Sequence, residues 1–238
     1  MRNFGLIGEK LNHSFSKEYF TKKFKNLKLN DYSYKNFEIN NLSNIKRIII
    51  ENKISGLNIT IPFKEQIIPY LDKITKEGNE IKAINTIKIE NDKLIGYNTD
   101  ILGFEKSISP ILKNRKKALI LGNGGASKAV KYILNKKNIE FKTVSRKGKI
   151  NYENLNDETI KEAKIIINTT PLGTFPNIKN YPNINYNLLT DQHLLYDLVY
   201  NPIKSEFLKR GEINGSEIKN GLEMLKIQAD ESWLIWNS

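Results

Sequence analysis

An apolar strand that runs directly into a glycine-rich turn is the feature that most constrains the fold of this chain. The strand is expected over Ala118–Leu121, the turn reads GNGGAS over residues 122–127, and a helix is expected over Ala126–Asn135. A buried strand, a tight turn and a helix in this order begin a strand–helix–strand unit with right-handed connections. The second half of the chain therefore predicts a parallel sheet covered by helices.

The turn also has the features of a dinucleotide-binding loop. Gly122 permits the sharp bend, and Gly124 lets the backbone approach a pyrophosphate, which the free amides and dipole of the helix start favour. The other residues placed in this candidate cofactor site are Asn123, Gly125 and Ala126. Ser127, which is small, stands at the third glycine position of the usual pattern. The alternative interpretation is a tight strand-to-helix turn that binds no ligand.

The next expected strand indicates which dinucleotide would bind. An NAD site usually has an acidic residue after this strand to hold the ribose hydroxyls. Here the strand Phe141–Val144 is followed by Ser145, Arg146 and Lys147, so a hydroxyl and two cations replace the acid. Because arginine can bind a phosphate in bidentate fashion, these residues predict NADP rather than NAD. Alternatively, the two cations are ordinary solvated charges of a loop.

The whole chain alternates strands and helices, which predicts an α/β fold. In the first half, strands are expected at Phe4–Gly8, Tyr32–Ile39 and Gly56–Thr60, a hairpin within Ile81–Tyr97, and helices at His13–Lys25, Ile45–Asn52 and Thr99–Ser107. In the second half, further strands are expected at Ile165–Asn168 and Leu194–Val199, and helices at Ile203–Lys209 and Leu222–Trp236. A charged break at Lys113–Lys117 suggests two domains, with the site expected in the cleft between them.

Composition narrows the classes of function. The formal charge is +12, but only five of the 38 basic residues are arginine and the lysines are scattered, so attraction of small anions is favoured over nucleic-acid binding. There are no cysteines and two histidines, so a metal site is not expected. No run resembles a membrane helix or a signal peptide. We expect a cytoplasmic protein that binds neither membranes nor nucleic acid.

Four short segments in the first half carry polar residues beyond what a plain fold needs. They read NHSFS over residues 12–16, GLNITIPFK over residues 56–64, AINT over residues 83–86 and GYNTD over residues 96–100. The serines of the first segment could cap a helix or bind a carboxylate. Asn98, Thr99 or Asp100 could likewise cap the helix that follows, and Lys64 could be one more surface lysine.

Taken together, these motifs resemble those of the shikimate dehydrogenase family. The resemblance rests on GLIG, HSFS, GLNITIPFK, INT, GYNTD, GNGGAS, NTTPLG, YDLVYNP and GLEML followed by QA, in this order over nearly the whole chain. It implies a substrate domain over residues 1–100 with 222–238, and a Rossmann-type NADP domain over residues 101–221. The C-terminal helix would return to the first domain.

The resemblance also implies a function and a set of site residues. The family reduces 3-dehydroshikimate to shikimate with NADPH on the route to chorismate and the aromatic amino acids. Lys64 and Asp100 would be the catalytic pair. The implied substrate-binding residues are Ser14 and Ser16 for the carboxylate, Thr60, Asn85 and Gln228 for the ring hydroxyls, and Tyr200. Those implied for the cofactor, beside the turn, are Thr170, Leu198 and Gly221.

The chemistry of a ketone reduction fits the catalytic pair. Hydride addition leaves developing negative charge on the carbonyl oxygen, and an ammonium group can stabilise that charge and supply a proton. Lysine suits this role because its pKa is readily tuned, and a nearby carboxylate such as that of Asp100 favours the charged form of Lys64. No metal is needed for these steps.

Three departures from the family pattern accompany the resemblance. Lys17 stands where the family usually has proline, Ser145–Lys147 replaces a common Asn-Arg-Thr, and the chain is somewhat short. Alternatives that remain open are a quinate/shikimate dehydrogenase with relaxed cofactor use and a catalytically silent NADP-binding protein. The expected partners are small molecules, and the protein is expected to be a monomer or homodimer.

Overall fold

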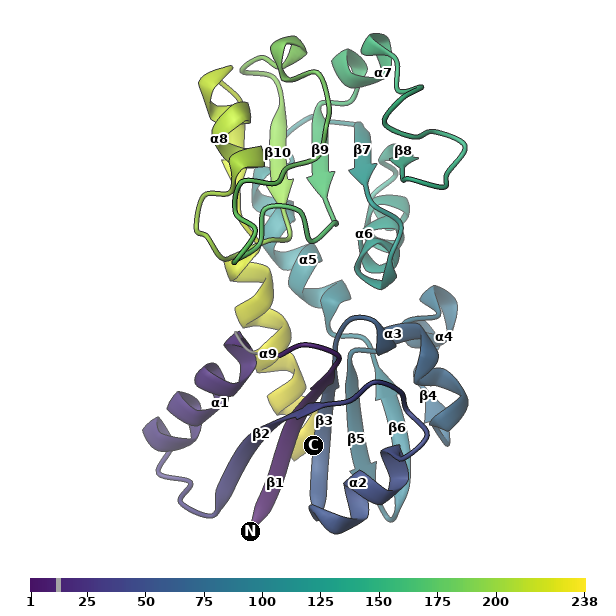
Figure 1. Ribbon diagram of the computed structural model, residues 1–238, viewed down its shortest axis with the longest axis vertical. Helices are drawn as coiled ribbons and strands as arrows, with labels where there is room; N and C mark the ends of the chain where they lie inside the picture. The colour runs from purple at the N-terminus through teal and green to yellow at the C-terminus, as the bar shows by residue number, and fades with distance from the viewer. Residues whose placement is uncertain (12–13) are drawn as a thin grey trace. The chain divides into compact units, whose positions relative to one another are not determined.

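The computed structural model describes residues 1–11 and 14–238, and it divides the chain into two compact units (Figure 1). Unit 1 comprises Met1–Thr99 and Ala229–Ser238, and unit 2 comprises Asp100–Gln228. The last helix, α9 (Leu222–Asn237), therefore begins in unit 2 and ends in unit 1. The predicted α/β fold with a returning C-terminal helix is confirmed. Asn12 and His13, the first residues of the NHSF motif and the predicted start of its helix, lie outside the described residues.

Unit 1 is built on a six-stranded mixed sheet. Its strands, in spatial order, are β2 (Tyr32–Glu38), β1 (Arg2–Gly8), β3 (Ile54–Ile59), β5 (Thr86–Glu90), β6 (Lys93–Tyr97) and β4 (Lys73–Ile74). β1 pairs in parallel with both β2 and β3, whereas β5 pairs antiparallel with β3 and β6. The hairpin predicted around Glu90 is therefore present. Its tight turn uses Asn91 and Asp92, both at positive φ, a conformation that these residue types tolerate better than most.

The helices of unit 1 cover both faces of this sheet. They are α1 (Phe15–Asn26), α2 (Ile45–Glu51), α3 (Phe63–Gln66) and α4 (Lys76–Ile81), together with the end of α9. Because side chains alternate along a strand, β1 sends Phe4 and Leu6 into a cluster with α1 and α9, and sends Ile7 into a second cluster with α2. Both faces are therefore buried, which accounts for the nearly continuous apolar run of β1.

Residues 56–59 of β3 alternate in the same way. Leu57 and Ile59 point into the cluster with α2, whereas Gly56 lies under the indole of Trp236 on α9. A Cβ at Gly56 would come within 2.4 Å of the ring, so only glycine lets α9 approach this closely. The Trp236 Nε1 donates a hydrogen bond to the Ile87 carbonyl at 3.0 Å, which satisfies a buried donor and fixes the end of α9 on the sheet.

Unit 2 is built on a five-stranded parallel sheet. Its strands, in spatial order, are β11 (Glu217–Lys219), β10 (Leu194–Asp197), β9 (Ile165–Asn168), β7 (Lys117–Leu121) and β8 (Glu140–Val144). The chain leaves β7 for β8 on one side and then returns to β9 on the other. This reversal between β7 and β9 is the place where open parallel sheets form ligand sites, at the carboxyl ends of the strands.

The helices of unit 2 pack on its sheet from both sides. They are α5 (Asp100–Ile108), α6 (Gly125–Lys136), α7 (Asp157–Glu162), α8 (Glu206–Ile213) and the start of α9. Leu119 and Leu121 of β7 belong to a cluster with Ile160 of α7 and Phe207 of α8. On the opposite face, Tyr196 shares a hydrogen bond of 2.6 Å with Ser107 of α5. The structure is therefore the three-layered arrangement that the Rossmann-type prediction requires.

The structure differs from the sequence-based elements in several places. The apolar start of the predicted hairpin region, Ile81, instead ends helix α4, and helix α7 was not predicted. Strand β10 stops at Asp197 because the Val199 amide bonds to the Asp197 side chain rather than to a neighbouring strand. The predicted helix from Ile203 begins only at Glu206, where the Ser205 hydroxyl accepts the Leu208 amide and caps it.

The described ranges, residues 1–11 and 14–238, lack two kinds of feature. Within them no helix combines the length and the apolar character that a membrane span requires. The same residues contain no group of three or more His, Cys, Asp or Glu side chains that could hold a metal ion. His193, the one histidine described, is fully buried and contacts Thr190, which is a structural role.

Candidate active site

The turn after β3 fixes the backbone around Lys64 in unit 1. The Thr60 amide donates to the Ile7 carbonyl at 2.9 Å, and the Phe63 amide closes the turn by donating to the Thr60 carbonyl at 2.9 Å. The fully buried side chains of Phe63 and Ile67 flank Lys64 in sequence and anchor α3 in the core. The Lys64 carbonyl accepts the Ile84 amide at 2.7 Å. The lysine therefore has a fixed backbone and a half-buried side chain, unlike an ordinary surface lysine.

Ser14 and Ser16 stand at the start of α1. Ser14 is the N-cap residue, and its Oγ accepts the Lys17 amide at 3.5 Å, so the capping interpretation holds for this serine. Ser16 instead lies beside Tyr34, whose pKa is raised mainly by burial, a shift that the Ser16 hydroxyl opposes. The two serines, which the sequence treats alike, therefore have different neighbours.

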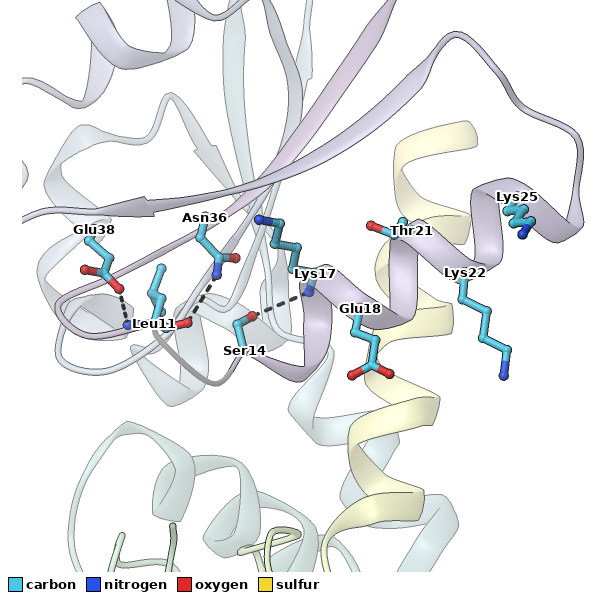
Figure 2. A pocket seen from close by; sticks show the side chains of 9 residues that line it. All are labelled: Leu11, Ser14, Lys17, Glu18, Thr21, Lys22, Lys25, Asn36 and Glu38. Carbon is cyan, nitrogen blue, oxygen red and sulfur yellow. Dashed lines mark hydrogen bonds between the residues drawn. The ribbon is translucent and has the colours of Figure 1, made fainter. Parts of the chain in front are cut away.

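Leu11 is held by β2 at the edge of a surface cavity of about 590 Å³ (Figure 2). Glu38 accepts the Leu11 amide at 2.7 Å, and Asn36 donates to the Leu11 carbonyl at 3.2 Å. The cavity is lined by Leu11, Ser14, Lys17, Glu18, Thr21, Lys22, Lys25, Asn36 and Glu38. Of the predicted substrate residues in the described part of the chain, it contains only Ser14.

A buried polar network lies between β3, β5 and α9 in unit 1. Asn58 is its centre: Oδ1 accepts the Tyr34 hydroxyl at 2.8 Å, and Nδ2 donates to Ser232 Oγ at 2.9 Å and to Thr86 Oγ1 at 3.2 Å. Ser232 and Thr86 also share a hydrogen bond of 2.8 Å. Burying this many polar atoms is tolerated only when they satisfy one another, as they do here.

The network extends to the predicted substrate residue Asn85. Its Oδ1 accepts the Thr99 amide at 2.7 Å, and its Nδ2 donates to Thr99 Oγ1 at 3.0 Å. Asn85 is buried and is therefore held in one orientation. Thr99 immediately precedes Asp100, so the same bonds fix the backbone that leads into α5. The side chain of Asn98 donates to the Ala83 carbonyl at 2.8 Å.

Asp100 and Gln228 belong to unit 2, on two helices that touch. Asp100 is the first residue of α5 and is buried, and its acidic side chain suits the helix start. One turn later, Gly103 faces α9, where a Cβ would lie 2.7 Å from the Met224 carbonyl and 3.3 Å from Cβ of Gln228. Gln228 is thus opposite the first turn of α5, on the helix that also carries Ser232.

The glycine turn of unit 2 is open on the side where a ligand would approach. Gly122 has a φ of 109°, and a Cβ there would lie 2.6 Å from Thr169 Oγ1. A Cβ at Gly124 would meet nothing within 4 Å, and Gly124 is an N-cap without a side-chain bond to the helix amides. Ser127 is fully buried and donates to the Gly124 carbonyl at 2.6 Å, so it replaces the third glycine without blocking the turn.

The side chain of Asn123 is not free, because its Oδ1 accepts a hydrogen bond from the ammonium of Lys131 at 2.5 Å. Lys131 lies on α6, and its pKa is lowered by burial and by the nearby charge of Lys128. Gly125 and Ala126, the other predicted residues of the turn, form the first turn of this helix. Two lysines of α6 therefore add positive charge close to the glycine turn.

The predicted phosphate-binding residues form a tight turn beside the glycine turn. The Val144 carbonyl at the end of β8 accepts the Gly122 amide at 2.8 Å, which joins the two turns. Ser145 begins a turn in which its carbonyl accepts the Gly148 amide at 3.1 Å. Arg146 and Lys147 are exposed within that turn, so both cations are accessible to a ligand on this edge of the sheet.

The remaining predicted cofactor residues lie at the carboxyl ends of β9 and β10. Thr170 donates to Asn168 Oδ1 through its amide at 3.0 Å and its hydroxyl at 2.6 Å. The Leu198 amide donates to the Asn168 carbonyl at 3.0 Å, and Gly221 lies directly against the Leu198 carbonyl. Tyr200 follows two residues later and is half-buried. Residues far apart in sequence thus meet at one edge of the sheet, as predicted for a Rossmann-type domain.

Sequence reasoning gave no role to two buried polar residues, Asn58 and Asp197. Each lies in an otherwise apolar strand, where a polar side chain requires partners. A polar residue within an apolar strand could therefore have indicated a role for both of them. Burial raises the pKa of Asp197 to about 6, although hydrogen bonds from Ser205, Val199 and Asn168 oppose the shift. The partners of Asn58 were hidden because Ser232 is 174 residues away in sequence.

Comparisons with known proteins agree with this arrangement. Residues 6–87 match the family model of the shikimate dehydrogenase substrate binding domain. A shikimate dehydrogenase (NADP(+)) of Clostridium beijerinckii is 40% identical over 250 residues, which cover 99% of this chain and 92% of that protein. These matches extend over the motifs of both units.

Two solved structures resemble the chain over its whole length. Shikimate dehydrogenase 1 from Peptoclostridium difficile has a TM-score of 0.88 and 38% identity, covering all of this chain and 92% of that one. Shikimate 5-dehydrogenase from Thermus thermophilus, in complex with NADP(H) and shikimate, has a TM-score of 0.86 and 26% identity, covering 99% and 93%. The chain described here belongs to the shikimate dehydrogenase family of oxidoreductases.

Proposed function

We propose that this protein is an NADP-dependent shikimate dehydrogenase that reversibly reduces 3-dehydroshikimate to shikimate on the route to chorismate. The observation that carries the proposal is the fixed, half-buried Lys64 within GLNITIPFK, in a chain that also retains Asp100. The relatives named for this reaction, and the similar structure with NADP(H) and shikimate, support it. The silent NADP-binding protein, an alternative from the sequence, would not need to keep both ionisable residues.

We assign substrate recognition mainly to unit 1. Ser14 and Ser16 would hold the carboxylate, because the start of α1 offers hydroxyls and backbone amides that favour an anion. The amide groups of Asn85 and Gln228 and the hydroxyl of Thr60 would bind ring hydroxyls, and Tyr200 would line the same substrate. The buried network around Asn58 supports this assignment, since it holds Asn85 in one orientation and places Tyr34 beside Ser16.

The cofactor is assigned to the carboxyl edge of the sheet in unit 2. The residues there fit a dinucleotide. Gly124, the N-cap residue of α6, leaves open space and has no side chain that could bond to the first amides of the helix. Arg146 and Lys147, with Ser145, would bind a 2′-phosphate, which favours NADP over NAD. Thr170, Leu198 and Gly221 would line the nicotinamide half, with Gly221 presenting its backbone. When bound, NADPH supplies the hydride.

Lys64 and Asp100 would carry out the remaining chemistry. The Lys64 ammonium would stabilise negative charge as it develops on the substrate oxygen and would then give that oxygen a proton. Asp100 would bind a substrate hydroxyl and accept its hydrogen bond. In the direction of shikimate oxidation, the same groups act in reverse and Lys64 takes the proton.

The test is the oxidation of shikimate with NADP⁺, followed by the nicotinamide absorbance. Lys64→Ala should lower kcat by roughly 10²–10⁴-fold, as expected for the loss of a general acid–base group, while the Kd for NADPH stays within error. Lys64→Arg keeps the charge but cannot exchange a proton near neutral pH, so it should also be slow. Lys93→Ala, at an exposed lysine of the hairpin, is the matched control. Near wild-type turnover in Lys64→Ala would refute the assignment.

A further inference from the structure

Asp197 ends β10 as a fully buried carboxylate with three hydrogen-bond donors. Ser205 donates its hydroxyl in a short bond, Asn168 donates its side-chain Nδ2 at 2.9 Å, and Val199 donates its backbone amide at 3.0 Å. Asp197 and Asn168 are also direct neighbours in the β9–β10 register. A buried carboxylate accepts this many bonds because an unpaired one would be very unfavourable.

On the β9 side, the Asp197 carboxylate determines the orientation of the Asn168 amide. A carboxylate only accepts hydrogen bonds, so the Nδ2 group of Asn168 has to face it, and this group also points at the Leu172 carbonyl at 3.3 Å. The Oδ1 atom is then turned toward Thr170, where it accepts the amide at 3.0 Å and the hydroxyl at 2.6 Å. The conformation of the segment at Thr170 thus depends on the acceptor that Asp197 presents to Asn168.

On the β10 side, the same carboxylate holds the turn that carries Leu198. The bond from the Val199 amide turns the chain away from the strand, and the Val199 carbonyl then accepts the Gly221 amide at 3.1 Å. A Cβ at Gly221 would lie 2.2 Å from the Leu198 carbonyl, so these two backbones are in close contact. Leu198 and Gly221 are therefore fixed to each other and, through Val199, to Asp197.

We propose that Asp197 is a positioning residue for the nicotinamide half of the cofactor site, acting through Asn168 on Thr170 and through Val199 on Leu198 and Gly221. This inference rests on the proposed function, because it takes those three residues as the cofactor lining. The side chain of Asp197 itself is buried beneath them and does not touch the ligand. Its action needs the one oxygen that accepts from both Asn168 and Val199, whereas the other oxygen accepts from Ser205.

The first experiment compares NADP⁺ binding and shikimate oxidation in Asp197→Ala and wild type. Alanine removes the acceptor that Asn168 and Val199 share, so we expect the Kd and KM for NADP⁺ to rise by about tenfold. The KM for shikimate should stay within about twofold, a split that general loss of structure would not produce. Asp191→Ala makes the same chemical change at an exposed position shortly before β10 and should leave all constants unchanged.

A second experiment changes each partner conservatively. Asn168→Asp places two carboxylates against each other and should weaken NADP⁺ binding several-fold. Asp197→Asn can keep an oxygen toward Asn168 and Val199 and donate its Nδ2 group to the Ser205 hydroxyl, so its Kd for NADP⁺ should stay within about threefold of wild type and well below that of Asp197→Ala.

The outcomes separate this inference from the proposed function. If wild type neither binds NADP⁺ nor oxidises shikimate, the proposed function fails. If wild type is active and Asp197→Ala binds NADP⁺ equally well, the positioning role fails, as it does if Asp197→Asn is weakened as much as Asp197→Ala. If Asp197→Ala does not fold, Asn168→Asp decides instead: it should raise the Kd for NADP⁺ several-fold, and an unchanged Kd overturns the proposal.

Discussion

The hydroxyl of Tyr34 donates to Asn58 Oδ1 at 2.8 Å in the interior of unit 1, and Ser16 lies beside the same hydroxyl. Tyr34 on β2 therefore lies between a predicted carboxylate ligand at the start of α1 and the buried network that holds Asn85. This relationship makes Tyr34 a sensitive position for both stability and substrate binding.

Tyr34→Phe should lower the free energy of unfolding by about 1–3 kcal/mol, because Asn58 Oδ1 is left buried without its donor. The KM for shikimate should rise, since Ser16 loses the neighbouring hydroxyl of Tyr34, while the KM for NADP⁺ should not change. Urea denaturation and steady-state kinetics measure these effects. Tyr32→Phe is the control on the same strand and face, where the hydroxyl accepts a hydrogen bond from Arg2 at 3.2 Å. Equal effects of the two changes would contradict the connection.

The two glycines of the cofactor turn should respond differently to alanine. Gly124→Ala adds a methyl group into open space, so the Tm of the free protein should stay within about 2 °C of wild type while the affinity for NADP⁺ falls. Gly122→Ala forces a side chain into positive φ and against Thr169, which should cost roughly 1 kcal/mol or more of stability. Thermal unfolding without ligand and calorimetric titration with NADP⁺ distinguish the two. Similar losses of Tm would show that Gly124 is structural.

Arg146→Ala should reduce the discrimination between the two nicotinamide cofactors. Loss of one charge-assisted contact to a phosphate should raise the Kd for NADP⁺ by about tenfold and leave the Kd for NAD⁺ unchanged. The control is Lys149→Ala, which removes an exposed cation three residues further along the chain. Equal weakening of NAD⁺ and NADP⁺ would place Arg146 elsewhere than at the 2′-phosphate. The ratio of the two dissociation constants is the quantity to compare.

Asp197 should leave a signature in the pH dependence of stability. Its pKa is raised by burial to about 6 in the folded protein, from 3.8, so the native state holds this proton more tightly than the unfolded state. The carboxyl group therefore contributes stability that is fully present below about pH 4 and is lost as pH rises through about 6, with a total of about 3 kcal/mol. Chemical denaturation of wild type and Asp197→Asn across this range should show that difference. Parallel curves would mean that the group titrates normally.

Much of the fold was predictable because its strands are short, apolar and buried on both faces. β9 was predicted to the residue, and β7 to within one residue. The helices α4 and α7 escaped prediction because each has six residues, too few for a periodic apolar face. The edge strand β4 has two residues and β11 has three, so their pairing depends on neighbours rather than on local pattern.

The candidate site was predictable only where its residues are close together in the sequence. The glycine turn and the cations after β8 are consecutive in sequence, so their types and spacing indicated a phosphate-binding edge. Asn85 is oriented by Thr99 and Thr170 by Asn168, and these bonds form only when the tertiary structure places the partners together. Asn58 meets Ser232, and Asp197 meets Asn168, across long stretches of chain. Such pairs have no short, fixed spacing in the sequence that a motif could describe.

The position of Trp236 over Gly56 has a consequence for the order of folding during synthesis. The first 99 residues leave the ribosome early, but the tryptophan that covers their sheet emerges after every residue of unit 2. We expect unit 1 to keep an exposed apolar face that favours chaperone binding until the end of α9 is available, whereas unit 2 can complete its sheet sooner. Limited proteolysis of a purified chain truncated after residue 228 would check this, since unit 2 should resist digestion and unit 1 should not.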